Sequence, residues 1–302
     1  MDLRQLEIIR AIAETGSFTG AGEKLHVSQS AVSRQVLLLE EELGEAVFLR
    51  VGRRVRITPA GESLLQLSHR LFQDLHDTVA GITDARTTLT GTLHLVGGMA
   101  VSLYVFPELL AAFHAAHPGV DVRLTAGSDE TCTALIRKGS ADLGLLTLPI
   151  DDVAFVSQPA FDEELLLVTA KSHPLAKRKR VVARDLKHET FIVYEPASNV
   201  RRIIDELFVR EHLEPRIAME TENAEIIKAL VRTGLGIAFL PYQAVASEAK
   251  DEQLFCARVH GEALVRQAAW VYPKASRVAR AVRALMDVFE EMKPSLRFAP
   301  AR

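Results

Sequence analysis

Short polar side chains crowd the stretch from Ser28 to Arg34, which reads SQSAVSR. The amide of Gln29 suits the hydrogen-bonding edge of adenine in the major groove of DNA, and the guanidinium of Arg34 suits guanine or a phosphate. Ser30 and Ser33 suit either a base or a phosphate. The stretch therefore predicts DNA recognition, provided that the first turns of one helix present all of these groups.

A cluster of arginines follows, at the tip of two short predicted strands in VFLRVGRRVRIT. The four positive side chains within seven residues are Arg50, Arg53, Arg54 and Arg56. This pattern predicts a β-wing that holds the DNA backbone. Residues 1–58 contain 8 basic and 8 acidic side chains, so their net charge is zero (8 − 8), and the whole chain carries −3. The segregation of the charges, rather than their total, would create the DNA-binding face.

A small helical domain, residues 1–58, must position these groups. A turn at Gly16 follows a first helix, a second helix ends at Leu25, and His26–Val27 is a tight connection. Ser28 is a good N-cap for a third helix, and Gly44 is a natural stop. The apolar faces expected in the core are Leu3, Leu6, Ile9 and Ala13 in the first helix and Val32, Val36, Leu39 and Leu43 in the third.

Residues 59–90 read as a long linker helix. Thr58 is its predicted N-cap, and Pro59 suits the first helical position. One stripe of the helix carries Leu64, Ser68, Leu71, Leu75, Val79 and Ile82. Because this spacing extends over about three heptads, it predicts the seam of a coiled-coil dimer. A dimer would present two recognition helices to an interrupted inverted repeat of double-stranded DNA.

Residues 91–302 alternate strands and helices, which predicts parallel sheets with right-handed crossovers. QAAWVY is a late strand that returns to the first half of this region. We therefore expect two α/β lobes, one from about 91–162 with 268–302 and the other from about 163–267. They resemble a periplasmic-binding-protein fold, which binds a small molecule in the cleft between its lobes. The overall fold class is α+β with several domains.

The cleft should be lined where strands end and helices begin. The residues expected there are Met99, Ala100, Val101, Ser102, Ser128, Thr147, Pro149, Ala197, Ser198, Asn199 and Asn223. Helix starts near Ser102 and Ser198 would favour an organic anion. Two alternatives to an anion site stay open: Ser102 and Ser198 are ordinary N-caps, or the pocket is lined by apolar side chains. We identify no Arg or Lys within the loops that line it, although Arg201 and Arg202 follow closely.

Other classes of protein have weaker support. The N-terminus lacks a signal peptide, and no apolar run is long enough to span a membrane, so we expect a cytoplasmic protein. Cys132 and Cys256 lie far apart, and we interpret them as structural thiols rather than redox sensors. His114 and His117 lack a third ligand, so we expect no metal, and no cofactor besides a small-molecule effector. The competing hypothesis is a solute-binding or enzymatic α/β protein with an attached interaction module, but no catalytic motif is present.

The chain as a whole resembles the LysR-type transcriptional regulators. The matching pieces are AETGSFT, LHVSQSAVSRQ, LEEELG, VFLR and TPAG, and the region from GTLHLVGG through GLGIAFLP to the last helix resembles the effector domain of that family. The resemblance implies a winged helix-turn-helix, a dimerising linker helix, a two-lobed effector domain, a homodimer or homotetramer, and contact with RNA polymerase. It assigns Gln29, Ser30, Ser33 and Arg34 to the recognition helix and Arg53 and Arg54 to the wing.

One departure from the family pattern lies in the second helix. Many relatives carry FTRAA where this chain has FTGAG. Gly20 and Gly22 each lower helix propensity by up to about 1 kcal/mol. Gly20 also lacks a side chain that would bind phosphate, so we expect weaker nonspecific affinity for DNA.

Overall fold

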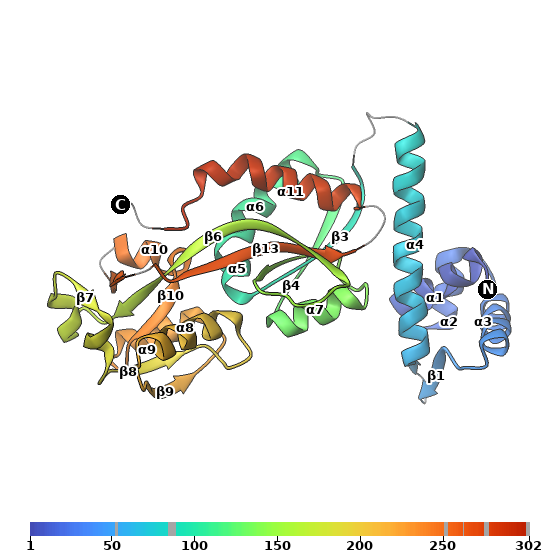
Figure 1. Ribbon diagram of the computed structural model, residues 1–302. Helices are drawn as coiled ribbons and strands as arrows, with labels where there is room; N and C mark the ends of the chain where they lie inside the picture. Colours follow the sequence, from blue (N-terminus) through green and yellow to red (C-terminus); the bar gives the residue numbers. More distant parts are fainter. Residues whose placement is uncertain (52–53, 84–88, 251–252, 262, 275–277, 300–302) are drawn as a thin grey trace. The chain divides into compact units, whose positions relative to one another are not determined.

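The computed structural model describes the chain except for residues 52–53, 84–88, 251–252, 262, 275–277 and 300–302. It contains two compact units, one built mainly from the first 87 residues and the other from the rest of the chain. The first unit is drawn in blue and cyan in Figure 1, and the second runs from green to red. Each unit has a hydrophobic core of its own.

The described part of the first unit is a helix-turn-helix with a hairpin and a long helix. Its elements are α1 (Leu3–Thr15), α2 (Phe18–Leu25), α3 (Gln29–Leu43), β1 (Phe48–Val51), β2 (Arg54–Ile57) and α4 (Pro59–Thr83). Strands β1 and β2 pair in antiparallel fashion, as a wing requires. The winged helix-turn-helix and the long linker helix predicted from the sequence are confirmed.

Local capping explains where the helices of this unit begin and end. The hydroxyl of Ser28 accepts a hydrogen bond from the N–H of Ala31 at 3.2 Å, so α3 begins where the sequence predicts. Gly44 ends α3 in the left-handed region, at φ 70°, which favours glycine. The hydroxyl of Thr58 accepts from the N–H of Gly61 at 3.0 Å at the start of α4. All three predicted signals are confirmed.

The core of the first unit lies where α1, α2 and α3 face one another. Its most buried side chains include Leu6, Ile9, Ile12, Val32, Val36 and Leu39. Leu3 and Ala13, which the sequence places on the core face, are exposed because the buried face of α1 is turned toward Ile12. Leu43 is also exposed, because it ends the last turn of α3.

Helix α4 has a packed half and an exposed half. Leu64 packs against the core, and Ser68 is fully buried, with its hydroxyl donating to the carbonyl oxygen of Leu6 at 3.1 Å. Further along, Leu75 is 42% and Val79 is 56% exposed. The prediction of one continuous seam is therefore wrong for the first half, which covers α1. Among the described side chains of α4, the exposed large apolar ones, Leu75 and Val79, lie in the second half and could meet a partner helix.

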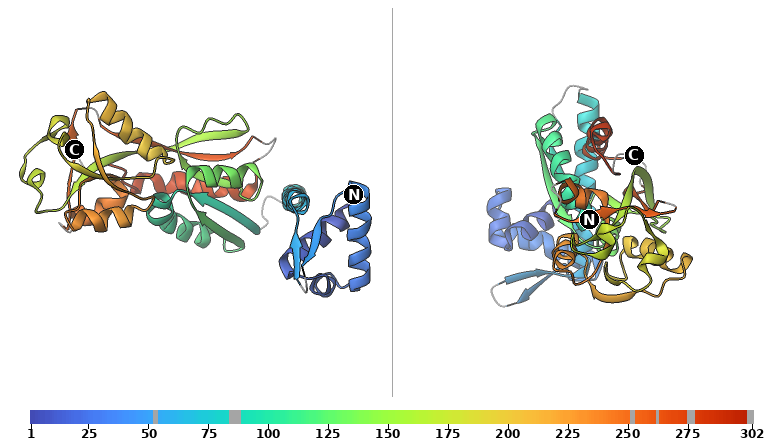
Figure 2. Two further views of the ribbon diagram at one scale, coloured as in Figure 1. Left: turned by 90° about the horizontal axis from the view of Figure 1, so that it is seen from below. Right: turned by 90° about the vertical axis from the view of Figure 1, so that its left-hand side faces the viewer.

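The first lobe of the second unit has a sheet with helices on both faces. Its elements are β3 (Gly91–Gly97), α5 (Met99–Tyr104), α6 (Phe106–Ala116), β4 (Val120–Ala126), α7 (Asp129–Arg137), β5 (Leu143–Thr147), α11 (Arg280–Met292) and the 3-10 turn η3 (Lys293–Ser295). Strand β3 pairs in parallel with β4 and β5, as predicted. Helices α6 and α11 pack together on one face (Figures 1 and 2), and α7 covers the other.

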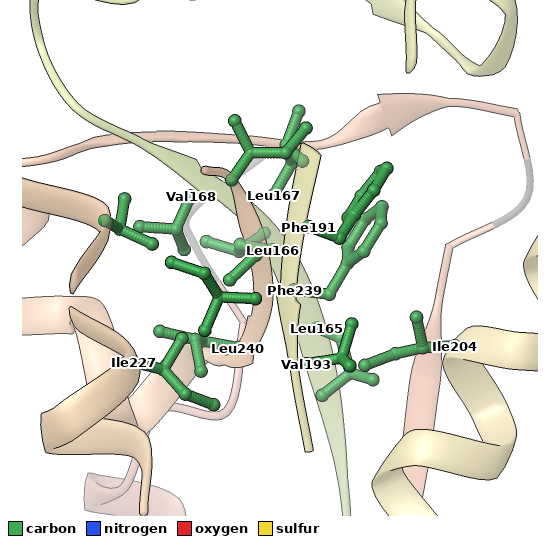
Figure 3. Close-up of a cluster of buried hydrophobic side chains, with 14 of the residues drawn as sticks. Leu165, Leu166, Leu167, Val168, Phe191, Val193, Ile204, Ile227, Phe239 and Leu240 are labelled. Atoms are coloured by element: carbon green, nitrogen blue, oxygen red, sulfur yellow. The ribbon is translucent and has the colours of Figure 1, made fainter. Parts of the chain in front are cut away.

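The second lobe repeats this plan with shorter strands. Its elements are η1 (Pro174–Lys177), β7 (Val181–Val182), η2 (Ala183–Leu186), β8 (Thr190–Val193), α8 (Asn199–Arg210), β9 (Arg216–Glu220), α9 (Ala224–Arg232), β10 (Ala238–Pro241), α10 (Tyr242–Lys250), β11 (Phe255–Ala257) and β12 (Val259–His260). Figure 3 shows its core, where Ile204 of α8 and Ile227 of α9 approach the strands from opposite sides. The rings of Phe191 and Phe239 are nearly parallel, with centroids 6.4 Å apart.

Two long strands, β6 (Phe155–Thr169) and β13 (Val265–Pro273), belong to both lobes. Strand β6 pairs with β13 up to Glu164 and with β10 from Leu165 onward. Strand β13 also pairs with β5 of the first lobe, so the late strand returns there as predicted. The expected lobe boundaries near residues 162 and 268 fall inside these two strands. The lobes are therefore joined through a continuous sheet rather than through loops.

Candidate functional site

The predicted DNA-reading residues lie together at the start of α3. Ser28, Gln29, Ser30 and Arg34 are exposed, and Ser33 is half-buried. The described residues offer the guanidinium of Arg34 no hydrogen-bond or ion-pair partner within the protein. The side chain of Arg34 is therefore available to a ligand outside the chain.

Hydrogen bonds within α3 orient the other side chains of this surface. The hydroxyl of Ser28 lies 2.9 Å from that of Ser30, and the amide of Gln29 donates to the hydroxyl of Ser33 at 2.8 Å. Gln29 keeps its amide oxygen and a second N–H for a base edge. The surface is thus partly ordered before any DNA is bound, which reduces the entropy lost on binding.

The wing is described only in part. Arg50 lies in β1 and Arg54 lies in β2, in neighbouring register positions of the hairpin. Arg56 is exposed on β2, and Arg53 lies outside the described residues. The hairpin therefore brings arginines from two strands to one element, as the sequence predicts.

The acidic residues at the end of α3 hold parts of the fold together, in addition to repelling phosphate. The carboxylate of Glu40 accepts from the N–H groups of Val47 (2.7 Å) and Phe48 (3.1 Å), which fixes the start of β1. Glu42 pairs with the amino group of Met1. Of Glu40, Glu41 and Glu42, Glu41 is the one that is exposed and makes no such hydrogen bond or ion pair with another described residue.

A cleft between the two lobes of the second unit gathers about half of the expected effector residues. It has a volume of about 510 Å³ including the space open to solvent. The expected residues that line it are Met99, Ala100, Ser128, Thr147 and Ser198. They come from both lobes, at the ends of strands and the starts of helices, which is where the sequence places them.

The remaining expected residues do not line this cleft. Val101 is buried in the core of the first lobe, and the hydroxyl of Ser102 donates to the carbonyl oxygen of Gly97 at 3.4 Å. Asn223 caps α9 through the N–H of Glu225 at 2.8 Å. Packing and capping already use these three side chains. Pro149 and Ala197 are exposed and lie outside the cleft lining as well.

Asn199 joins the lobes instead of lining the cleft. Its amide donates to the carbonyl oxygens of Thr147 at 2.7 Å and Pro149 at 3.3 Å. Helix α8 of the second lobe is thereby tied to the end of β5 in the first. The two expected helix starts also differ: Ser102 lies inside α5, whereas Ser198 precedes α8 without capping it through its side chain. The simple capping interpretation is therefore wrong for both serines.

The floor of the cleft contains a cation that sequence reasoning missed. Arg266 of β13 is almost fully buried, and its guanidinium pairs with Glu163 of β6. Its Nη1 donates to the hydroxyl of Thr147 at 3.2 Å. The search of the loops for an Arg or Lys missed this residue, because Arg266 comes from a strand 119 positions from Thr147 rather than from a loop.

Two further titratable groups lie at the cleft. The hydroxyl of Tyr194 is buried and has no hydrogen-bond partner among the described residues. Burial raises the pKa of Tyr194, with Glu163 adding to the rise and Arg266 opposing it. Burial also raises the pKa of Asp129, although hydrogen bonds from the backbone of Thr147 and Asn199 oppose that rise. Tyr194 thus supplies a neutral donor, and Asp129 supplies a carboxyl group that protonates more readily than usual.

A second polar cluster joins the lobes outside the cleft. Tyr104 of α5 donates to Glu225 of α9, and its ring lies 5.3 Å from the ammonium of Lys228. Lys228 is buried and pairs with both Glu225 (2.7 Å) and Glu248 of α10. Tyr104 of the first lobe therefore takes part in a charged network whose other members belong to the second lobe.

The cysteines and histidines form no reactive centre within the described ranges. Burial raises the pKa of Cys132 to about 12 and that of Cys256 to about 11. The ring of His117 lies against Phe113, with centroids 5.1 Å apart. Among the residues that the structure describes, no group of three His, Cys, Asp or Glu side chains is placed to hold a metal ion. No described helix is long and apolar enough to cross a membrane.

Two protein-family models match the chain. The "LysR substrate binding domain" matches residues 86–293, and the "Bacterial regulatory helix-turn-helix protein, lysR family" matches residues 3–62. The first match covers the unit that holds the cleft, and the second covers the unit that holds α3 and the wing. Together they account for both candidate sites.

Individual relatives agree with these matches. The chain is 34% identical over 267 residues to "HTH-type transcriptional regulator CfxR" of Cupriavidus necator, covering 88% of this chain and 84% of that protein. It is 30% identical over 287 residues to "RuBisCO operon transcriptional regulator" of Allochromatium vinosum, covering 95% of each. Among solved structures, a full-length OxyR variant from Pseudomonas aeruginosa has a TM-score of 0.78, covers 96% of this chain and 95% of its own, and is 23% identical, which is a likeness of fold.

Proposed function

We propose, from the premise that this chain belongs to the LysR family of DNA-binding transcriptional regulators, that a ligand in the cleft between its lobes controls how the protein binds DNA. The relatives are regulators rather than enzymes, so the enzymatic alternative is set aside. The observation that carries the proposal is the hydrogen bond from Asn199 of the second lobe to the carbonyl oxygen of Thr147, a first-lobe residue that lines the cleft. A ligand that contacts both lobes there acts on their relative position, and the coupling to DNA is reciprocal.

The DNA-binding part of the proposal assigns roles to α3 and the wing. Gln29, Ser30, Ser33 and Arg34 enter the major groove, and Ser28 and the wing arginines hold the backbone. The position of the first four at the start of one helix supports this assignment. A regulator that binds DNA in this way works in the cytoplasm, where it also meets RNA polymerase.

We propose that the second half of α4 forms the dimer contact, and that two dimers associate as a tetramer. Leu75 and Val79 offer apolar surface on that half. Leu75→Glu is expected to reduce the molar mass in solution, measured by light scattering, because it places a charge at the apolar contact. Ser63→Glu, exposed on the same helix but about 120° around it from Leu75, is the matched control and should leave the mass unchanged. Equal masses for all three proteins would refute this contact.

The ligand that suits the cleft is a small organic anion that also carries hydroxyl groups. Arg266 and the start of α8 favour a negatively charged oxygen. Asp129 and Glu222 line the same cleft and accept hydrogen bonds, so they favour a ligand that also donates them. No cofactor is needed for such a sensor. The names of the relatives supply the first target to test, a RuBisCO operon.

The test is binding of the purified full-length protein to the DNA that flanks its own gene and to a RuBisCO promoter, measured by fluorescence anisotropy at several salt concentrations. We expect sequence-specific binding whose affinity falls with salt, because arginines displace counterions from phosphates. Hydroxylated organic acids are then added one at a time, and an effector should change the affinity. Equal affinity for random DNA in every condition would overturn the proposal.

A further inference from the structure

An apolar side chain lies in the middle of the polar face of α3. Leu37 is 54% exposed and follows Ser33 and Arg34 by four and three residues. Since a helix turns by about 100° per residue, Leu37 lies between these two on the helix surface, and in line with Ser30 two turns earlier. Val36, on the core side, is buried. Leu37 therefore belongs to the face that carries the DNA-reading residues.

The fold does not account for the presence of Leu37. Its side chain is not among the described residues that form the core of the first unit or pack against it. Single exposed leucines are common on protein surfaces, so exposure alone carries no function. What distinguishes Leu37 is its position in line with Ser30 and between Ser33 and Arg34.

The surroundings limit what Leu37 can meet. The next residue on its stripe, Glu41, is exposed, and its carboxylate is repelled by phosphate. Leu37 is therefore the last residue on this face that a DNA duplex favours. Leu38 is also exposed, at 44%, and follows Arg34 by four residues, but it lies beyond Arg34 at the edge of this face, about 100° around the helix from Leu37.

We propose that Leu37 recognises the C5 methyl group of a thymine in the major groove. That methyl is the apolar feature that the base pairs present in this groove, and apolar side chains select it. Leu37 lies about 4.5 Å further along the helix axis than Arg34, little more than the ~3.4 Å rise of one base pair. The thymine should therefore lie one or two base pairs from the base or phosphate that Arg34 contacts. This role depends on the DNA-binding function of the family and not on the identity of the effector.

The experiment removes the methyl group from the DNA and the leucine from the protein, separately and together. The full-length protein first selects its binding site from a random duplex library. Each thymine of that site is then replaced by deoxyuridine, which lacks only the C5 methyl. Dissociation constants are measured by anisotropy for the wild type, Leu37→Ala and the matched control Leu38→Ala. Thermal unfolding of each protein checks that the fold is retained.

We expect one or two deoxyuridine positions in each half-site to weaken wild-type binding by about fourfold, the effect of removing one buried methyl-sized group. Leu37→Ala should weaken binding to the thymine site and lose its sensitivity at those positions, whereas Leu38→Ala should behave as wild type. The proposal is overturned if no deoxyuridine position affects the wild type, or if Leu37→Ala keeps the wild-type pattern. It is also overturned if Leu37→Ala alters only the oligomer mass, which would identify a protein contact. Failure to select any site would instead count against the DNA-binding function itself.

Discussion

Arg266 on β13 and Glu163 on β6 form a buried ion pair that lies where both strands cross from one lobe to the other. The Nε of Arg266 donates to Oε2 of Glu163 at 2.7 Å, and Oε1 of Glu163 accepts from the N–H of Gln243 at 2.7 Å. Each charged group therefore has several partners. A buried pair of this kind is tolerated because those hydrogen bonds replace the lost water.

Removing one partner should be strongly destabilising. Glu163→Gln leaves the Arg266 charge buried without a carboxylate, and we expect a loss of about 3–5 kcal/mol in the free energy of unfolding. Trp270, the single tryptophan of the chain, lies buried in the second unit, so its fluorescence in urea reports on that unit. The control is Glu206→Gln, which disrupts the exposed pair with Arg202 (3.8 Å) and should cost less than about 1 kcal/mol. If both variants lost the same free energy of unfolding, burial would not be what makes the Arg266–Glu163 pair important.

Acid should weaken the network that joins the lobes at Tyr104. Burial raises the pKa of Glu225, but hydrogen bonds from Lys228 and Tyr104 outweigh it, so the net pKa lies below the ordinary 4.5. The folded protein thus binds this proton less readily than the unfolded chain. The ionised carboxylate of Glu225 therefore stabilises the folded protein above about pH 4.5. This contribution is lost as the pH falls through the lowered pKa.

The measurement is the midpoint of thermal unfolding between pH 3 and pH 7. Glu225→Gln should lose less stability than the wild type on acidification, and Tyr104→Phe should fall between them, because it removes one of the two hydrogen bonds. Parallel curves for all three proteins would show that Glu225 does not titrate with a lowered pKa.

Gly22 should resist replacement despite its position in a helix. A Cβ at Gly22 would lie 2.7 Å from the carbonyl oxygen of Val27, in the backbone of the turn before α3. Gly22→Ala should therefore lower stability by about 1–3 kcal/mol through overpacking, even though alanine favours helix by up to about 1 kcal/mol. The comparison is Gly20→Ala in the same helix, where the atoms nearest the new Cβ belong to the side chains of Ser17 and Thr15 rather than to the backbone, so the loss of stability should be smaller. A stabilised Gly22→Ala protein, judged by circular dichroism of α-helix on heating, would refute this contact.

Both thiols should react slowly in the native protein. Burial raises the pKa of Cys132 and Cys256 well above the ~8.5 of a free cysteine, so little thiolate exists near neutral pH. We expect labelling by Ellman's reagent to be about a hundredfold or more slower than for free cysteine, and fast once guanidinium unfolds the chain. Rapid labelling of native Cys256 would reopen the interpretation of a redox sensor.

The helix-turn-helix is predictable from sequence because its signals are local. Ser28, Gly44 and Thr58 act on residues within one turn of the helices that they begin or end. The function of Gly22 is not predictable in the same way. The propensity scale counts it as a weakness, whereas the structure shows a close approach between α2 and the following turn, which is a tertiary contact. The split of α4 into a packed and an exposed half is likewise set by α1, through Ser68 and Leu6.

The cleft is predictable only where it is built from loops. Strand ends and helix starts identify Ser128, Thr147 and Ser198 from local patterns. Arg266 and Tyr194 reach the cleft from β13 and from the end of β8, and nothing near them in the sequence indicates which cleft they face. A single charged residue, Arg266, in the mostly apolar strand VRQAAWVY was the available signal, since a charge is retained in such a strand only with a partner.

The return of β13 to the first lobe has a consequence for how the protein is made. The first lobe begins at residue 91, but its sheet lacks β13 and its core lacks α11 until residues 265–292 have been synthesised. The DNA-binding unit is complete on the ribosome some two hundred residues earlier. Each new chain therefore contains the whole helix-turn-helix unit before the residues that complete its cleft have been added. A premature stop codon before β13 would leave the sheet of the first lobe incomplete and the cleft without Arg266.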